Sequence, residues 1–323
     1  MRTTELDDAL NDPLVSIIIP TFSRPEMFYE ALSSATSQCY TNIEVVVSDD
    51  SSDGATRDMV ALYRAANPSQ RLIYRRNVPA LGAARNFADS LGLASGKYVN
   101  LLMDDDRLRP DMIETMVRVM EEDASVVLCT SCRSAIDEHG VQRSLLPGLE
   151  MVVSCDAVLD GIGVGDLCLE RSMNFIGEPS TALFRADAMS EPFGSMSDRL
   201  YGCNVDMATW LTLASSGRVS FTRRVLSETR VHSSRQSNTM QMRLRSLTDW
   251  LHQIRVGRDF GFLADRRADN SAVDFAIRNA EAGIVLAASL GKLSSELESL
   301  KSDLLREMSL LVSSRSPVRS IQS

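Results

Sequence analysis

The stretch YVNLLMDDDRLRPD, residues 98–111, joins an apolar run directly to three consecutive carboxylates. The apolar run predicts a buried strand. Asp104, Asp105 and Asp106 follow it without a turn residue, and adjacent carboxylates repel one another unless a cation offsets their charge. Hard divalent ions such as Mg²⁺ and Mn²⁺ prefer oxygen ligands and commonly bind carboxylates together with substrate phosphates. The stretch therefore predicts a metal and phosphate site, and a solvated acidic turn before the next helix is the alternative.

Short apolar runs alternate with helical patterns on either side of this stretch. This alternation predicts an α/β fold with a mostly parallel sheet flanked by helices. Ligands of such sheets bind beyond the carboxyl ends of the strands, where Asp49, Asp50 and the triplet fall. Strands are expected at residues 14–20, 42–48, 71–76, 98–103 and 124–131, and helices at 24–38, 52–66, 82–95, 110–123 and 204–217.

Composition excludes several classes of protein. The 323 residues include 34 Lys and Arg against 43 Asp and Glu, a net charge of −9 that offers no general attraction to nucleic acid. The polar, acidic start does not resemble a signal peptide, and no apolar run approaches the ~20 residues that span a bilayer. A cytoplasmic protein is expected. The pair Cys129 and Cys132 has no second pair at zinc spacing, which favours free thiols.

Two stretches, residues 15–54 (VSIIIPTFSRPEMFYEALSSATSQCYTNIEVVVSDDSSDG) and 82–111 (GAARNFADSLGLASGKYVNLLMDDDRLRPD), resemble family 2 glycosyltransferases of the GT-A fold. The family pattern is P-T-[YF]-N-R, V-D-D-G-S-x-D, G-x-x-x-A-R-N, G-x-Y-[IV] and an aspartate cluster followed by proline. Each motif alone is weak, whereas the ordered set is specific. The resemblance covers residues 15–126, resumes loosely at 179–185 and 204–232, and implies inverting, metal-dependent sugar transfer from a nucleotide-diphospho-sugar to an acceptor hydroxyl.

The resemblance and the sequence pattern together suggest four parts of the chain. A flexible leader (1–13) precedes a GT-A catalytic domain (14–238), whose nucleotide-binding half ends at residue 130 and whose acceptor half begins at 131. A C-terminal helical extension (239–312) and a disordered tail (313–323) follow.

The resemblance also implies a nucleotide-binding set. Pro20 and Phe22 match residues that line the base, and Asp50 matches the carboxylate that binds it. A flat ring suits stacking on a base, while core packing is the alternative for Phe22. Arg85 matches a phosphate-side position, with a salt bridge on a helix face as its alternative. The full implied set is Pro20, Phe22, Arg24, Asp50, Arg85 and Asp104.

The implied cofactor is Mn²⁺ or Mg²⁺. Counted back from Pro110, Asp105 falls on the principal metal-binding position of the family. Met103 stands where the family often has a further aspartate, so the choice of two ligands among the three carboxylates stays open. Asp106 and, in ETRVHSSRQS, His232 are the further implied ligands, and a structural role is the alternative for the histidine.

The implied catalytic base is Asp206 in NVDMATWLTLASSG, where Val205 replaces the usual glutamate of the family. A base must accept the proton of the attacking hydroxyl. A charge that only caps the helix is the alternative, because a carboxylate is favoured at a helix N-terminus. The diphosphate and acceptor side of the site is implied to include Pro179, Ser180, Arg230 and Arg235.

The expected partners are a nucleotide-sugar donor and a saccharide or lipid-linked acceptor. UDP is the family default, with GDP and dTDP open, and surface polysaccharide or O-antigen synthesis is the first expectation. A protein acceptor, such as a surface appendage subunit, and a catalytically inactive sugar-nucleotide-binding scaffold are the alternatives. A dehydrogenase is disfavoured because PTFSRP, residues 20–25, lacks G-x-G-x-x-G.

Two helical patterns near the C-terminus raise further interpretations. The segment 242–260 combines apolar and arginine side chains, and either lies peripherally on the inner face of a membrane or packs on the catalytic domain. A stripe of leucines and a methionine packs either on the body or in a homodimer. The stripe consists of Leu293, Leu297, Leu300, Leu304, Met308 and Leu311.

Overall fold

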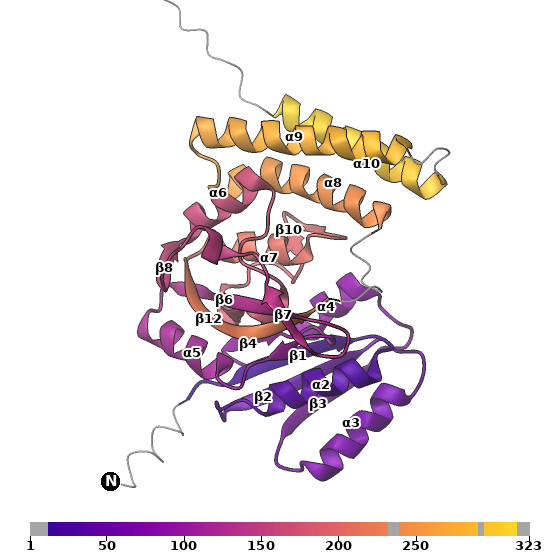
Figure 1. The fold of residues 1–323 in the computed structure, drawn as a ribbon, viewed down its shortest axis with the longest axis vertical. Helices are drawn as coiled ribbons and strands as arrows, with labels where there is room; N and C mark the ends of the chain where they lie inside the picture. The colour runs from indigo at the N-terminus through magenta and orange to yellow at the C-terminus, as the bar shows by residue number, and fades with distance from the viewer. Residues whose placement is uncertain (1–11, 232–238, 290–293, 315–323) are drawn as a thin grey trace, which may run out of the picture. The chain divides into compact units, whose positions relative to one another are not determined.

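The computed structural model describes residues 12–231, 239–289 and 294–314 (Figure 1). These residues divide into two compact units. The first contains residues 12–164, 174–200 and 205–231, and the second contains 165–173, 201–204 and the described residues after 238. Most of the predicted leader and of the predicted tail lies outside the described residues.

Four parallel strands form the first half of the large sheet in the first unit. Their order is β3-β2-β1-β4, so the chain steps outward from β1 and then returns to its other side. Both faces are covered, and every residue of β1 and β2 is accordingly buried. The strands are β1 (Val15–Thr21), β2 (Ile43–Asp49), β3 (Arg71–Arg76) and β4 (Tyr98–Leu101).

The second half of the sheet is mixed. β9 (Leu183–Arg185) is inserted antiparallel between β4 and β6 (Val126–Ile136), and β6 pairs in parallel with β12 (Arg218–Arg230). β5 (Arg107–Leu108) closes the edge against β12. The remaining strands are β7 (Gln142–Leu145) and β8 (Ala157–Asp160), with β10 (Ser195–Met196) and β11 (Arg199–Leu200) in a separate pair. The predicted α/β class with a largely parallel sheet is confirmed.

Helices cover both faces of this sheet because right-handed crossovers in opposite directions lie on opposite sides. Ile17 and Ile19 of β1 belong to one core cluster with α2 and α5, whereas Ile18 points to the other face. The helices of this unit are α2 (Pro25–Thr36), α3 (Ala55–Ala66), α4 (Ala83–Leu91), α5 (Met112–Glu122), α6 (Gly161–Arg171, shared with the second unit) and α7 (Val205–Ala214). Short 3₁₀ turns are η1 (Leu149–Met151), η2 (Pro179–Thr181) and η3 (Ala186–Ala188).

The second unit is mainly helical, which confirms the predicted C-terminal helical extension. It contains α8 (Met240–Gly257), the 3₁₀ turn η5 (Arg258–Phe260), α9 (Arg266–Ser289) and α10 (Ser295–Ser313), and α10 packs against α8 and α9 (Figure 1). Leu304 and Leu311 of the predicted stripe are buried, while Leu293 lies outside the described residues.

The segment proposed as a membrane-facing surface is not an exposed apolar face. Trp250, Leu251 and Ile254 are all buried, so they offer no surface to a bilayer. Within the described residues, no helix is long and apolar enough to cross a membrane. The six cysteines are all free, as expected from their spacing.

Gly96 fixes the approach of β4 to β1 and yields a stability prediction. A Cβ at this position would lie 2.6 Å from the Ser16 backbone nitrogen and 2.9 Å from the Leu14 carbonyl oxygen. We expect Gly96→Ala to lower the free energy of unfolding by about 1–3 kcal/mol, because backbone atoms of a packed strand must shift. Urea denaturation measures the change. Gly92→Ala is the control, since its added Cβ would meet only the Asp89 carbonyl oxygen at 3.6 Å, an ordinary contact. Equal unfolding midpoints for the two variants would show that the close approach is not a constraint.

Candidate functional site

The three consecutive carboxylates lie just beyond β4, beside the end of β1. The strand order reverses between these two strands, and ligands of open α/β sheets bind at such a point. Asp104, Asp105 and Asp106 are each at most 6% exposed. They are therefore a buried cluster and not a solvated acidic turn.

Asp104 is held by the residues that leave β1. Its Oδ2 accepts hydrogen bonds from the Thr21 hydroxyl at 2.9 Å and from the Phe22 backbone N–H at 3.1 Å. Arg24 lies on its other oxygen, at 3.4 Å. The contacts join the turn after β1 to the turn after β4.

Asp106 is held from the opposite direction. Its Oδ2 accepts a hydrogen bond from the Ser180 hydroxyl at 2.6 Å, and its Oδ1 accepts one from the Arg230 backbone N–H at 2.9 Å. The Ser180 hydroxyl oxygen in turn accepts a bond from the Met103 N–H at 3.0 Å. Ser180, which follows Pro179 in η2, is thus placed against the triplet, and both residues are buried.

Asp105 faces a cation supplied by the chain itself. The Arg24 Nη1 lies 3.1 Å from Asp105 Oδ2 and 3.4 Å from Asp104 Oδ1, so one guanidinium group bridges two carboxylates. The Arg24 side chain is 33% exposed. A partly exposed arginine in this position offsets part of the repulsion.

Burial and mutual repulsion shift the protonation equilibria of the cluster. Burial raises the pKa of Asp104 to about 6, and the neighbouring charge of Asp105 adds to the shift. The same two causes raise the pKa of Asp106 to about 8. Both shifts favour the neutral acids, so full ionisation of the cluster requires positive charge beside it.

The donor set fits a divalent cation that shares its coordination with a ligand. Asp104 and Asp105 each direct one oxygen at the same guanidinium group, and hard cations commonly take one or two carboxylates plus phosphate oxygens. Within residues 12–231, 239–289 and 294–314, no group of three or more His, Cys, Asp or Glu side chains is arranged to hold a metal. His232 and Arg235 lie outside the described residues.

The predicted nucleotide-binding residues differ in their accessibility. Phe22 is 58% exposed beside Asp104, which excludes core packing as its role, while Pro20 is buried within β1. Arg85, in the first turn of α4, is exposed and makes no ion pair with the described residues.

Asp50 is buried and binds its own chain. Its carboxylate accepts hydrogen bonds from the backbone N–H groups of Leu81 and Gly82, at 3.2 and 2.8 Å, and from the Asn77 amide at 2.8 Å. These bonds hold the entry to α4, where Gly82 has a φ of +81° that favours glycine. The contact of Asp50 with a base stays a prediction.

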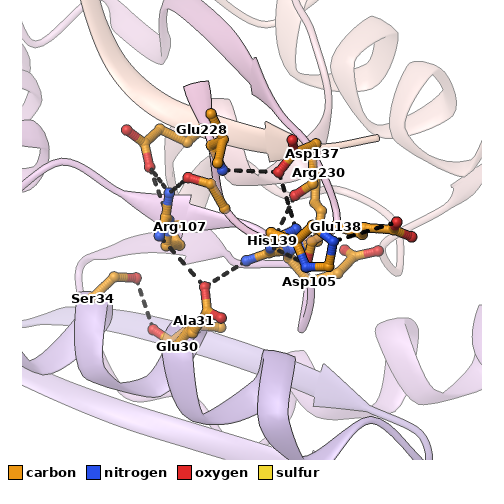
Figure 2. A network of polar contacts seen from close by, with 12 residues as sticks. Glu30, Ala31, Ser34, Asp105, Arg107, Asp137, Glu138, His139, Glu228 and Arg230 are labelled. Atoms are coloured by element: carbon orange, nitrogen blue, oxygen red, sulfur yellow. Dashed lines mark hydrogen bonds and ion pairs between the residues drawn. The ribbon is translucent and has the colours of Figure 1, made fainter. Parts of the chain in front are cut away.

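The side chain of Arg230 bonds to the backbone of the triplet at Asp105 (Figure 2). Its side chain is fully buried, and its Nε donates to the Asp105 carbonyl oxygen at 2.8 Å. Its terminal nitrogens bond Glu30 at 2.6 Å and the carbonyl oxygens of Asp137 and Glu138 at 3.0 and 3.2 Å. The predicted contact of Arg230 with a diphosphate is untested, and its observed contacts position the backbone of Asp105.

Glu30 and Arg107 complete this network, although no sequence signal singled them out. Arg107 donates to Glu228 at 2.9 Å and lies 3.4 Å from Glu30 (Figure 2). The Glu30 side chain is 40% exposed on α2, so the helical pattern gave no signal of its contacts. The network therefore ties α2, β5 and β12 together behind the aspartates.

Asp206 lies in the first turn of α7 with its carboxylate fixed by two donors. Oδ1 accepts a bond from the Met207 N–H and Oδ2 one from the Asn174 amide, both at 2.8 Å. Burial raises the pKa of Asp206 to about 6. A carboxylate with a pKa near neutrality is well suited to accept a proton from a hydroxyl group.

Residues 174–180 connect Asp206 to the triplet. Asn174, which bonds Asp206, also bonds the carbonyl oxygen of Gly177 at 2.9 Å, and Trp210 Nε1 donates to the same oxygen at 2.9 Å. Ser180 at the other end of this segment bonds Asp106. A candidate base and the aspartate triplet thus flank one short segment, which we call the 174–180 loop.

Comparison with known proteins gives a consistent picture. Residues 16–154 match the sequence profile of a family described as Glycosyl transferase family 2. The chain is 35% identical over 126 residues to "Abequosyltransferase RfbV" of Salmonella typhimurium, a match that covers 38% of each chain. It is 32% identical over 128 residues to "Chondroitin synthase" of Escherichia coli, covering 40% of this chain and 18% of that one. The chain thus spans well under half the length of these relatives.

Solved structures share the fold over nearly the whole chain. "Crystal structure of S. aureus TarS 1-349 in complex with UDP-GlcNAc" matches with a TM-score of 0.66 and 16% identity, over 93% of this chain and 81% of that one. The mannosyltransferase PcManGT from Pyrobaculum calidifontis, "in complex with GDP-Man and Mn2+", matches with a TM-score of 0.54 and 16% identity, over 95% and 89%. The predicted GT-A fold is confirmed.

The Arg230 network yields a second stability prediction. We expect Arg230→Lys to lower the free energy of unfolding by about 2 kcal/mol or more, because one ammonium group cannot replace four directional bonds in a buried site. Chemical denaturation measures the loss. Arg143→Lys is the matched control, since Arg143 also contacts Asp137 but is 61% exposed. Similar stability of the two variants would contradict a supporting role for Arg230.

Proposed function

We propose that the chain, whose residues 16–154 match Glycosyl transferase family 2, transfers a sugar from a nucleotide-diphospho-sugar to an acceptor hydroxyl group, with inversion at the anomeric carbon. The observation that carries this proposal is the placement of Asp206 and the aspartate triplet at the two ends of the 174–180 loop. A leaving group on one side and an attacking group on the other are what an in-line displacement needs.

The donor is expected to bind where β1 and β4 end. The exposed ring of Phe22 would stack on the base, and Arg85 would approach the phosphates. Asp105, together with Asp104 or Asp106 and with His232, would hold Mg²⁺ or Mn²⁺, which when bound supplies Lewis-acid stabilisation of the departing diphosphate. UDP is the default nucleotide of the proposal, and GDP and dTDP are the alternatives to test.

Asp206 is the proposed general base. Its carboxylate would take the proton of the acceptor hydroxyl as that oxygen attacks the anomeric carbon. The amide of Asn174 and the N–H of Met207 donate hydrogen bonds to this carboxylate, and these bonds hold the base in one orientation.

The proposed acceptor is a hydroxyl group of a growing saccharide that is carried on a lipid. The proposed process is surface polysaccharide assembly, with the transfer taking place in the cytoplasm. Support comes from two relatives whose names denote an abequose transferase and a chondroitin synthase. A protein acceptor would leave the same donor chemistry unchanged.

Asp105→Asn tests the cation site and the proposed activity together. We expect a loss of about 100-fold or more in Mn²⁺-dependent release of UDP, GDP or dTDP from a panel of sugar donors, because one ligand oxygen and one charge are removed. Asp111→Asn is the control, since Asp111 lies outside the cluster and pairs with Arg224. Tight donor binding by the wild-type chain without any turnover would replace the enzyme by a sugar-nucleotide-binding scaffold.

The pKa of Asp206 predicts the pH dependence of transfer. A base acts only when ionised, and the ionised fraction falls about tenfold for each pH unit below a pKa of about 6. We expect the transfer rate to be level above pH 7 and to fall below pH 6. Asp206→Asn should lower the rate about 100-fold or more at every pH while the donor still binds. A wild-type rate that increases on acidification would argue against Asp206 as the base.

A further inference from the structure

Glu178 occupies the middle of the 174–180 loop and has no role in the steps above. The loop is fixed on one side through Asn174, which bonds Asp206, and on the other through Ser180, which bonds Asp106. Glu178 is separated from Ser180 by Pro179 alone, and its side chain is 29% exposed. Its position is therefore set by contacts to both the candidate base and the aspartate triplet.

A buried arginine, Arg133, binds the Glu178 carboxylate. Arg133 of β6 is 4% exposed, and its Nε donates to Glu178 Oε2 while its Nη2 donates to the Pro147 carbonyl oxygen at 2.9 Å. Its remaining terminal nitrogen, Nη1, is buried and has no hydrogen-bond partner in the part of the chain that the structure describes. A buried donor without a partner costs about 1–3 kcal/mol, so this arrangement is not explained by stability.

Two glycines make room for the arginine. A Cβ on Gly148 would lie 2.7 Å from Arg133 Nη1, and one on Gly177 would lie 3.1 Å from the same atom. Gly177 has a φ of +112°, a conformation that other residues rarely adopt. The backbone on both sides is thus shaped around the guanidinium group that fixes Glu178.

The second carboxylate oxygen of Glu178 is available to a ligand. Only Oε2 bonds Arg133, and Oε1 makes no hydrogen bond to the described residues. The charge of Glu178 also raises the pKa of both Asp106 and Asp206, which agrees with its position near each. In an in-line transfer, the sugar ring must lie between the leaving diphosphate and the attacking hydroxyl.

We propose that Glu178 accepts a hydrogen bond from a ring hydroxyl of the sugar being transferred, and that Arg133 is the positioning residue that orients it. Glu178 would then recognise the sugar moiety of the donor and not its nucleotide. This inference rests on the proposed function, since it needs a sugar donor bound between the triplet and Asp206.

Calorimetry in the presence of Mn²⁺ tests the inference. The affinity of the chain for UDP-GlcNAc is compared with its affinity for UDP, and the affinity for GDP-mannose with that for GDP. We expect Glu178→Gln to weaken binding of the sugar nucleotide by about tenfold or more and to leave binding of the nucleoside diphosphate unchanged. The substitution preserves shape and packing. Arg133→Lys should shift the same ratio in the same direction, whereas a merely structural role would weaken both ligands equally.

Glu150→Gln is the matched control. Glu150 is a carboxylate near the same arginine, but it bonds the Gly148 N–H at 2.7 Å and lies outside the 174–180 loop, so the ratio should not change. An unchanged ratio in Glu178→Gln, with wild-type binding intact, overturns the inference alone. A wild-type chain that binds none of the four ligands, and neither dTDP nor a dTDP-sugar, overturns the proposed function along with it.

Discussion

The repulsion among three buried carboxylates at the end of β4 is the constraint on which the site depends. Each carboxylate is held by a different part of the chain: Asp104 by the turn after β1, Asp106 by Ser180 and β12, and the backbone of Asp105 by Arg230. Arg24 supplies one positive charge between two of them. These contacts place the carboxylates without neutralising them fully, which leaves the cluster suited to bind a further cation.

The same constraint separates the chemical roles of the aspartates. Asp206 stands apart from the triplet, and the donors that bond its carboxylate among the described residues are neutral. Burial is the main cause of its pKa of about 6, and the charge of Glu178 adds to the shift. The carboxylates of the triplet instead interact electrostatically with one another and with Arg24. In the proposed mechanism, carboxyl groups in one site would serve as base and as cation ligands because their surroundings differ. The 174–180 loop bonds to both groups, through Asn174 and through Ser180.

The sequence predicted the parallel half of the sheet because β-branched runs and short helices carry a strong local pattern from β1 to β4. It also pointed to the triplet as a candidate site, since adjacent carboxylates directly after a strand are unusual. It did not predict the antiparallel β9, or pairs such as Glu30 with Arg230, 200 residues apart, and Arg133 with Glu178. Such contacts have no local signature, and residues 135–197 lack a clear periodicity. The resemblance named Ser180, and the structure adds its bond to Asp106.

Electron–nuclear double resonance of bound Mn²⁺ tests the need for a cation at the triplet most directly. The measurement detects coupling between the electron spin of the ion and the ³¹P nuclei of added UDP or GDP. We expect one Mn²⁺ per chain with ³¹P coupling, because in the proposed site the carboxylates and the diphosphate share the ion. A chain that binds the nucleotide but holds no Mn²⁺, or holds it without ³¹P coupling, would contradict a cation-neutralised cluster.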